Sequence, residues 1–496
     1  MKKNRTRLSK YIIRIFVILA VTYSALLIPG PESPIVPPGT ASPFLWNQDE
    51  YWSYLESSFL SARSTDHAIL AESIESKLAI TWSMLDLCQD GDIEPSSPLL
   101  LQLERIFFEL SPLVAVETDY LADFVELRTS LRKTIKDQSR HWDMNSAEAR
   151  NRLYRLLFGT RTAVEEIELQ ADDGLIPAWL IGVNEPSATP AAELLGVEIH
   201  SGDILVSRGG APTSALIARG NDYPGNFSHV ALVYVDEKSG EVSIIESHIE
   251  CGVAIASIED YLRDTKLRIM ILRMRSDHPA IVGDPLLPHK AAGKSLKRAR
   301  TEHIPYDFAM DFKDNGKLFC SEVASDAYSQ MGVTLWMGIS NISSSGVRSW
   351  LATFGVKYFE TQEPSDLEYD PQLRVVAEWH NPETLYKDHL DNAVIDVMLE
   401  GAERGEKLDY LWYKLPLARL AKAYSFILNL SDSVGPVPEG MDAASALKNE
   451  LFSKRHTDIK NRMMQMAEDF QTANGYRPPY WELVELARRA KVELYD

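Results

Sequence analysis

Cysteine is scarce in this sequence, because its 496 residues include only three, Cys88, Cys251 and Cys320. An odd number this small excludes a disulfide framework, so we expect at least one free thiol. Positive charge is also in short supply, since 51 Lys+Arg face 71 Asp+Glu and leave a formal net charge of -20. Binding to a nucleic-acid backbone draws on clustered positive charge, so we expect no nucleic acid among the partners.

Several patterns that bind nucleotides or metals, or that activate serine, are missing. Residues 293–295 (Gly-Lys-Ser) end like a phosphate-binding loop, but Pro288 occupies the position of its first glycine. Residues 248–250 (His-Ile-Glu) begin like a zinc deaminase motif, and no Pro-Cys-x-x-Cys follows. Neither Gly-x-Ser-x-Gly nor His-Glu-x-x-His occurs. We therefore expect no cofactor and no metal.

The first thirty residues differ from the rest of the chain. Residues 1–10 are rich in lysine and arginine, and an apolar run at 11–28 follows, broken only by Arg14. This pattern is typical of a signal anchor or a cleaved secretory signal, with a buried helix as a third alternative. We expect residues 1–30 to be a retained single-pass anchor in the cell (inner) membrane. The positive-inside rule then leaves the body outside the cytoplasm, in the periplasm or at the cell surface.

Helical segments dominate both flanks of the remaining chain. Residues 31–46 are rich in proline and predict an extended spacer. Residues 47–180 show helical periodicity and predict a helical region. Residues 371–496 are predicted to be helical again, with apolar side chains at helical spacing at Leu417, Leu420 and Tyr424. The partners of the two helical regions stay unknown at this stage.

The middle of the chain, residues 190–370, differs from the flanks in composition and hydrophobic periodicity. Short β-branched runs separated by turn residues predict strands, at 204–207, 230–235, 242–246 and 268–274. Two apolar-periodic segments, 290–303 and 320–331, predict helices. The fold class is therefore predicted to be α+β.

Cys320 lies where a polar loop enters the second of these helices. A thiol in the first turn of a helix meets unpaired backbone N–H groups and the positive end of the helix dipole, which favour the thiolate. Cys320 is on this reasoning a candidate nucleophile. The alternative is a buried structural cysteine, because free cysteine is among the most buried residue types.

His229 and Glu246 are predicted to share one face of a hairpin. If residues 237–240 form the loop, His229 lies opposite His248 and Glu246 is its diagonal neighbour. If the loop is 236–239, Glu246 lies directly opposite His229. In both registers the carboxylate can orient the imidazole, although His248 competes for that role and His229 can also be a core residue.

Five short motifs, taken together, resemble the YiiX/YebB-like branch of the NlpC-type superfamily. They are Gly-Asp-Ile-Leu-Val (202–206), Ser-His-Val-Ala-Leu-Val (228–233), Ile-Ile-Glu-Ser (244–247), Tyr-Asp-Phe (306–308) and Phe-Cys-Ser-Glu (319–322). The resemblance implies a circularly permuted papain-like catalytic core at 190–370, in which the histidine and its polar partner precede the cysteine. It implies Cys320 as nucleophile, His229 as base and Glu246 as orienting acid. Long helical flanks are not part of the minimal family pattern.

Two further residues are candidates for the substrate or oxyanion site. Tyr306 and Asp307 precede Cys320 by a short segment and can line its pocket. The alternative is a packed aromatic ring and a turn aspartate.

The sequence therefore predicts an anchored extracytoplasmic cysteine hydrolase that cleaves an amide bond, as in cell-wall peptides, through a Cys-His-Glu triad. A lipid acyl hydrolase or acyltransferase acting on an ester or amide, and a catalytically inactive envelope scaffold, are the alternatives.

Overall fold

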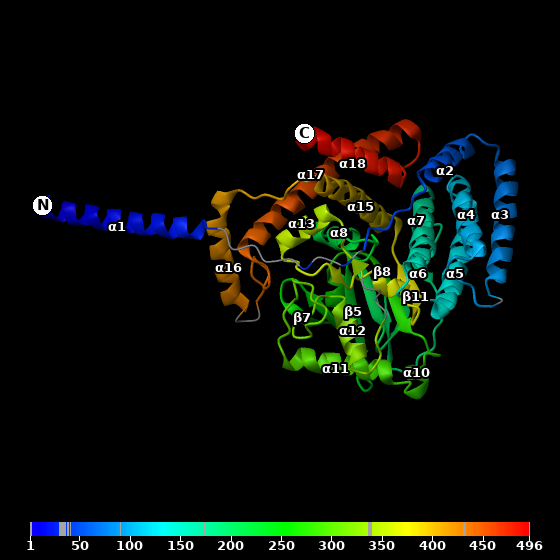
Figure 1. The fold of residues 1–496 in the computed structure, drawn as a ribbon, viewed down its shortest axis with the longest axis horizontal. Coiled ribbons are helices and arrows are strands. Elements are labelled where there is room, and N and C mark those ends of the chain that lie inside the picture. The colour runs from blue at the N-terminus through cyan, green and yellow to red at the C-terminus, as the bar shows by residue number, and fades with distance from the viewer. Residues whose placement is uncertain are drawn as a thin grey trace.

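A seven-stranded antiparallel sheet lies at the centre of the molecule, in the spatial order β1-β11-β8-β4-β5-β6-β7 (Figure 1). The structure is a computed structural model that describes residues 2–28, 36, 39, 41–89, 91–172, 174–335, 340–429 and 433–495, with side chains from residue 13 onward. The strands of this sheet are β1 (Trp179–Ile181), β4 (Ile204–Gly209), β5 (His229–Val235), β6 (Val242–His248), β7 (Gly252–Ala256), β8 (Lys266–Met274) and β11 (Leu373–Trp379).

Helices cover one face of the sheet, and a hairpin covers much of the other. On the first face, α10 (Pro279–Gly283), α11 (Leu287–Thr301) and α12 (Glu322–Ser329) pack on side chains that include Val230, Leu232 and Ile245. On the second face, β2 (Ala191–Leu194), β3 (Val197–His200) and α9 (Ile258–Arg263) pack on side chains that include Ala231 and Val233. The α+β class is confirmed, and the four expected strands are all present.

One expected element is wrong. The chain was predicted to turn helical directly after residue 370, but Leu373–Trp379 forms β11 and pairs with β8 and β1. Its pairing partners are distant in the sequence, and packing between them favours the extended backbone of the β-branched Val375 and Val376. The helices of this flank begin only at Pro382.

The N-terminal flank is a bundle of helices around its own core, on the right in Figure 1. Phe107, Phe124 and Leu131 are among the fully buried side chains of this core. A π-helical turn, Tyr154–Gly159, joins the last two helices. The helices are α2 (Asp49–Ala62), α3 (His67–Leu87), α4 (Pro98–Val114), α5 (Leu121–Gln138), α6 (Ala147–Leu153) and α7 (Thr160–Gln170).

The C-terminal flank surrounds a second helical core above the sheet in Figure 1. Val394, Phe452 and Leu486 are among its buried side chains. The helices of this flank are α15 (Pro382–Glu403), α16 (Leu415–Asn429), α17 (Ala443–Asn474) and α18 (Tyr480–Tyr495). The central region adds α13 (Ser345–Phe354), which packs in the same core, and α14 (Asp366–Tyr369), which precedes β11. The remaining short elements are α8 (Pro212–Arg219), the strands β9 (Ser340–Asn341) and β10 (Glu360–Thr361), and the 3-10 helices at Thr118–Tyr120, Ser139–His141 and Trp412–Lys414.

Buried ion pairs join the N-terminal helices to the sheet. Arg128 and Arg132 of α5 both bind Glu378 of β11, with Nη1 to carboxylate distances of 2.7 and 2.5 Å. Arg161 of α7 pairs with Glu368 of α14. All of these side chains are buried, so the helical flank is integral to the sheet's own structure.

The N-terminal segment forms α1 (Lys2–Leu26), which extends away from the body (Figure 1). Within the described residues, no helix combines enough length with enough apolar character for a membrane crossing. Half of the proline-rich spacer at 31–46 (residues 31–35, 37, 38 and 40) lies outside the described residues. Its described end is packed, because Phe44 and Trp46 contact the N-terminal bundle.

Candidate active site

The β5–β6 hairpin carries the two polar residues predicted for the site. Asp236 N donates a hydrogen bond of 2.9 Å to Glu241 O, and Ala231 pairs with Glu246. This is the first of the two expected registers, in which Glu246 is a diagonal neighbour of His229 on the same face. Gly240 closes the loop with a φ of 70°, a left-handed conformation that suits glycine.

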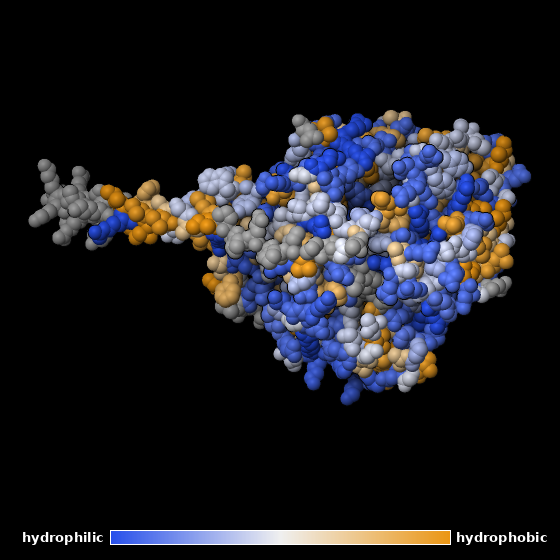
Figure 2. Space-filling view, in the orientation of Figure 1, coloured by the Kyte–Doolittle hydropathy of each residue, from blue (hydrophilic) through white to orange (hydrophobic). Residues whose placement is uncertain are grey.

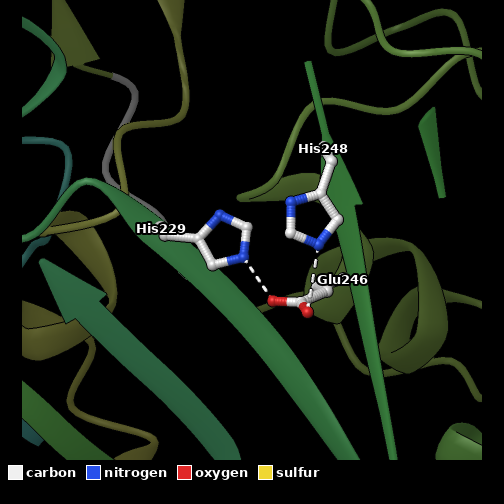
Figure 3. Close-up of side chains that lie close together, drawn as sticks. All are labelled: His229, Glu246 and His248. Atoms are coloured by element: carbon white, nitrogen blue, oxygen red, sulfur yellow. Dashed lines mark hydrogen bonds and ion pairs between the residues drawn. The ribbon is translucent and has the colours of Figure 1, made fainter. Parts of the chain in front are cut away.

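Glu246 contacts two imidazole rings, one with each carboxylate oxygen (Figure 3). Its Oε2 is 2.7 Å from His229 Nε2, and its Oε1 is 3.0 Å from His248 Nε2. The two rings are stacked with centroids 5.5 Å apart. His248, the competitor foreseen for the orienting role, therefore does not replace Glu246 but binds its other oxygen. The Nδ1 atom of His229 points away from Glu246 (Figure 3).

The charges of this trio are set by burial and by the shared carboxylate. Burial alone raises the pKa of Glu246, but hydrogen bonds from both histidines outweigh it and hold that pKa below its usual range. Burial lowers the pKa of His229 despite the nearby carboxylate, so this ring is neutral at pH 7. Burial also acts to lower the pKa of His248, but Glu246 outweighs it and the pKa is raised. A neutral His229 held at Nε2 can accept a proton at Nδ1.

Cys320 lies two residues before α12, close to the predicted start of the helix. Its carbonyl accepts a 3.3 Å bond from Val323 N. Its Sγ donates to Ser228 O at 3.7 Å and lies 4.0 Å from Ser321 Oγ. The residue is only 5% exposed, and burial raises the pKa of the thiol to about 12. Within the described part of the chain, the sulfur makes no hydrogen bond with His229.

Strand alternation puts the His229 side chain and helix α12 on opposite faces of β5. His229 follows the face of Ala231 and Val233, whereas α12 packs on the face of Val230 and Leu232. Ser228, which binds the sulfur, immediately precedes β5. The structure brings His229 and Glu246 together and places Cys320 beside the same end of the hairpin.

The two oxyanion candidates behave differently. Tyr306 lies close enough to Cys320 for their charges to interact, and burial first and that charge second raise the pKa of its phenol well above its usual range. Its hydroxyl stays protonated and can donate a hydrogen bond. Asp307 instead accepts backbone N–H bonds from Ala309 (2.9 Å) and Asp311 (2.6 Å). Asp307 thus has the geometry of a turn aspartate, the alternative stated above.

A glycine allows the segment before Tyr306 to approach the hairpin. Gly252 has a φ of +76°, and a Cβ there would lie 2.1 Å from Ile304 O. Val253 N donates to the same carbonyl at 2.9 Å. Any side chain at position 252 would displace this segment and Tyr306 with it.

Two buried acids near Cys320 were not predicted to be site residues. Glu363 has no hydrogen-bond partner for Oε2 among the described residues, and its charge would act on Cys320. Burial raises the pKa of Glu363 well above its usual range, so it is a neutral acid that can donate a hydrogen bond. Burial likewise raises the pKa of Glu322 to about 9, although its Oε2 accepts a bond from Phe319 N. No sequence motif distinguishes Glu363 from an ordinary surface glutamate.

The trio also offers ligands for a metal ion. One atom from each of His229, Glu246 and His248 lies within 4.8 Å of the other two. Two imidazoles and a carboxylate suit zinc and similar divalent ions. The sequence patterns predict no metal site, and this grouping of two histidines and a glutamate was not among the predictions.

The C-terminal flank reaches the edge of the site. Glu439 N donates to Glu250 O at 3.3 Å, in the turn that follows β6, and Glu439 Oε1 lies 2.9 Å from His303 Nε2. A Cβ on Gly440 would lie 2.3 Å from the Phe308 ring, which packs edge-on against Tyr306. The segment around Glu439 is therefore part of the wall of the site.

Comparison with known proteins identifies the central region. Residues 198–377 match the family described as permuted papain-like amidase enzyme, YaeF/YiiX, C92 family. No curated protein and no solved structure matches the chain. The family match confirms the resemblance drawn from the motifs and, with the central sheet, the permuted papain-like fold of this region.

Proposed function

We propose that this chain, which contains a permuted papain-like amidase domain at residues 198–377, is a cysteine hydrolase that cleaves an amide bond through Cys320, His229 and Glu246. The observation that carries the proposal is the 2.7 Å bond between His229 Nε2 and Glu246, at the end of the hairpin where Cys320 lies. It holds the ring with Nδ1 available, as a general base requires.

The chemistry follows the residues in order. His229 Nδ1 takes the thiol proton as Cys320 Sγ attacks the amide carbonyl, and Glu246 stabilises the imidazolium. Backbone N–H groups at the start of α12, together with the Tyr306 hydroxyl, donate to the oxyanion. The imidazolium then protonates the leaving amine, and a thioester remains on Cys320. Water, deprotonated by His229, hydrolyses the thioester and releases the acid and the free thiol.

The sulfur must first leave the Ser228 carbonyl. A rotation about χ1 of Cys320 moves Sγ between staggered positions without moving the backbone. Catalytic hydrogen bonds are often long or misaligned without substrate and tighten in its complex. Bound substrate therefore supplies the interaction that selects the reactive rotamer.

The substrate and the location are part of the same proposal. A basic segment before an apolar run, here in α1, favours an anchor in the cell membrane with the body outside the cytoplasm. Cell-wall peptides are the amides that a body in that place meets, and a lipid amide or ester is the second choice. Cell fractionation, with the mass of the mature N-terminus, tests the anchor. Recovery of the intact chain in the soluble fraction contradicts it.

A specific observation favours a second function, an inactive scaffold. The Cys320 thiol is buried, its pKa is about 12, and it donates to a carbonyl in place of the imidazole. A degenerate site would keep this arrangement permanently. The helical flanks would then carry the function by binding partners.

Acylation of the thiol separates the two functions without a known substrate. We expect p-nitrophenyl acetate to release nitrophenolate in a burst matched by one acetyl group on Cys320, located by peptide mass spectrometry. Cys320→Ala should lose the burst. Cys251→Ala should keep it, because Cys251 is not part of the proposed triad of Cys320, His229 and Glu246. An acetyl group on any other residue, or no burst, contradicts the hydrolase. Incubating the wild type, Cys320→Ala and Cys251→Ala with cell-wall fragments and with phospholipids then identifies the bond cleaved.

A further inference from the structure

Helix α16 turns an apolar face outward. Its inner side, with Leu415, Ala418 and Ser425, is buried, and Leu415 and Ala418 pack on the start of α17. Its outer side carries the apolar residues whose spacing predicted this helix, and Leu417 is 71% exposed. The exposed apolar residues of this segment are Leu411, Trp412, Tyr413, Leu417, Leu420, Tyr424, Phe426 and Ile427, which we call the α16 surface.

The α16 surface is too concentrated to be ordinary surface. Single exposed apolar residues are normal, but a contiguous group marks a contact with another molecule or with a membrane. Four of its eight members are aromatic, and three of them (Trp412, Tyr413 and Tyr424) combine an apolar ring with a polar atom. Such rings concentrate where lipid headgroups meet the hydrocarbon core.

The α16 surface is continuous with α1. Tyr23 Oη donates to Tyr413 O at 3.0 Å. Arg419 Nη1 and Nη2 donate to the carbonyls of Leu26 and Ile28, at 2.8 and 2.5 Å. Helix α16 lies across the base of α1 (Figure 1), and apolar residues gather along α1 and around its base (Figure 2). The same medium that covers the apolar side chains of α1 therefore reaches α16.

Charge plays little part in this surface. Lys414 pairs with Glu450, Arg419 binds the end of α1, and Lys422 Nζ donates to the carbonyls of Pro438 and Glu439. The cations of α16 (Arg419 and Lys422) and Lys414 directly before it thus all have partners within the protein. With a net charge of -20, the chain has no general attraction to anionic lipid. Contact with a membrane would rest on apolar burial.

We propose that the α16 surface is a membrane-contact surface, with α16 lying in the lipid–water interface beside α1. This inference does not need the cysteine chemistry, and it extends the anchor proposed above from one helix to a defined face of the body. An amphipathic helix with aromatic and leucine side chains on its apolar face binds in this way.

Contact at α16 would also fix the orientation of the site. Lys422 and Ser425, on the side of α16 toward the body, hold the segment that includes Val437 and Glu439. Glu439 in turn binds the turn after β6. The end of the hairpin that carries His248 would therefore face a region close to the membrane surface.

The test places a fluorescent probe on the full-length chain. Leu420→Cys, labelled with nitrobenzoxadiazole in a Cys251→Ser, Cys320→Ala background, reports on α16, since the remaining native cysteine, Cys88, is buried. Leu101→Cys in α4 is the matched control, because Leu101 (51% exposed) resembles Leu420 (59% exposed) and lies in the N-terminal bundle. Both proteins are added to phosphatidylcholine vesicles, with and without phosphatidylglycerol or spin-labelled lipid.

We expect the position-420 probe to shift to the blue and to be quenched by spin-labelled lipid, and the position-101 probe to stay in water. Binding should be similar with and without phosphatidylglycerol, and Leu420→Asp should weaken it about tenfold. A position-420 probe that stays in water on vesicle-bound protein overturns the α16 surface while leaving α1 as an anchor. A blue shift that needs high protein concentration and no lipid identifies a second copy instead. Absence of any vesicle binding overturns both.

Discussion

Glu246→Gln is the sharpest test of the proposed catalytic centre. The carboxylate accepts one hydrogen bond from each of two imidazoles, whereas an amide can accept with its oxygen and must donate with its nitrogen. The substitution preserves size and removes the charge. Its effect on acylation of Cys320 therefore depends on which end of the amide faces His229.

The two orientations give the limits of the expected loss. If the amide oxygen faces His229, the tautomer is kept and only the charge that stabilises imidazolium is lost, a loss of about 10²-fold or 2.7 kcal/mol. If the nitrogen faces His229, it donates to Nε2 and forces the ring proton onto Nδ1, which can no longer accept the thiol proton. The equivalent change in a serine triad costs about 10⁴-fold.

Burst kinetics with p-nitrophenyl acetate measure this loss directly. We expect Glu246→Gln to acylate about 10²–10⁴-fold more slowly than wild type, and Glu246→Asp, which keeps the charge, to recover part of the rate. His248→Gln is the control, because it removes the outer partner of Glu246 and leaves its bond to His229. A Glu246→Gln rate within about tenfold of wild type, with circular dichroism unchanged, would refute the orienting role.

Four further outcomes follow from the charges, the burial and the candidate metal ligands of these residues. Burial lowers the pKa of His229, so acylation should fall with acid only below the ordinary histidine value of about 6.5, and an acid limb above it contradicts a buried neutral base. Because the pKa of Cys320 is about 12, the rate of its alkylation by iodoacetamide should rise about tenfold per pH unit up to pH ~10. A rate that reaches a plateau near neutral pH contradicts a buried thiol. Glu378→Gln leaves two buried guanidinium groups unpaired and should lower the free energy of unfolding in urea by about 3–5 kcal/mol, whereas a change below about 1 kcal/mol contradicts their burial. Zn²⁺ should inhibit acylation of Cys320 by binding His229, Glu246 and His248. His248→Gln should weaken this inhibition by about tenfold or more. Inhibition by Zn²⁺ that is unchanged in His248→Gln would exclude these three residues as a metal site.

The hairpin was predictable because its information is local. Alternation along β5 and β6 and the short loop between them limit the register to two choices, and both put Glu246 on the face of His229. The position of Cys320 near a helix start follows from a change of local pattern, which also needs no distant contact. The resemblance to the family then assigns the roles of base, orienting acid and nucleophile to His229, Glu246 and Cys320.

Non-local features were not predictable in the same way. β11 is a strand because it pairs with β1 and β8, and the residues 373–379 alone carry no information about which strands they pair with. Glu363 matters only because distant parts of the chain bury it beside Cys320. The period of Leu417, Leu420 and Tyr424 predicts a helix with an apolar face, but periodicity does not say whether protein or lipid covers that face. The structure leaves it uncovered.

Arg268 shows why the flanks cannot be treated as attachments to a catalytic core. This side chain of β8 binds Glu165 of α7 at 2.5 Å and Asp388 of α15 at 2.6 Å, and all three groups are buried. One guanidinium therefore joins the sheet to both helical regions. Charges buried in this way are tolerated only when all partners are present, because removing one leaves an uncompensated ion. Arg268 lies within the family match at 198–377 and these two partners lie outside it, so among the described residues the charge of Arg268 is neutralised by carboxylates of the two flanks.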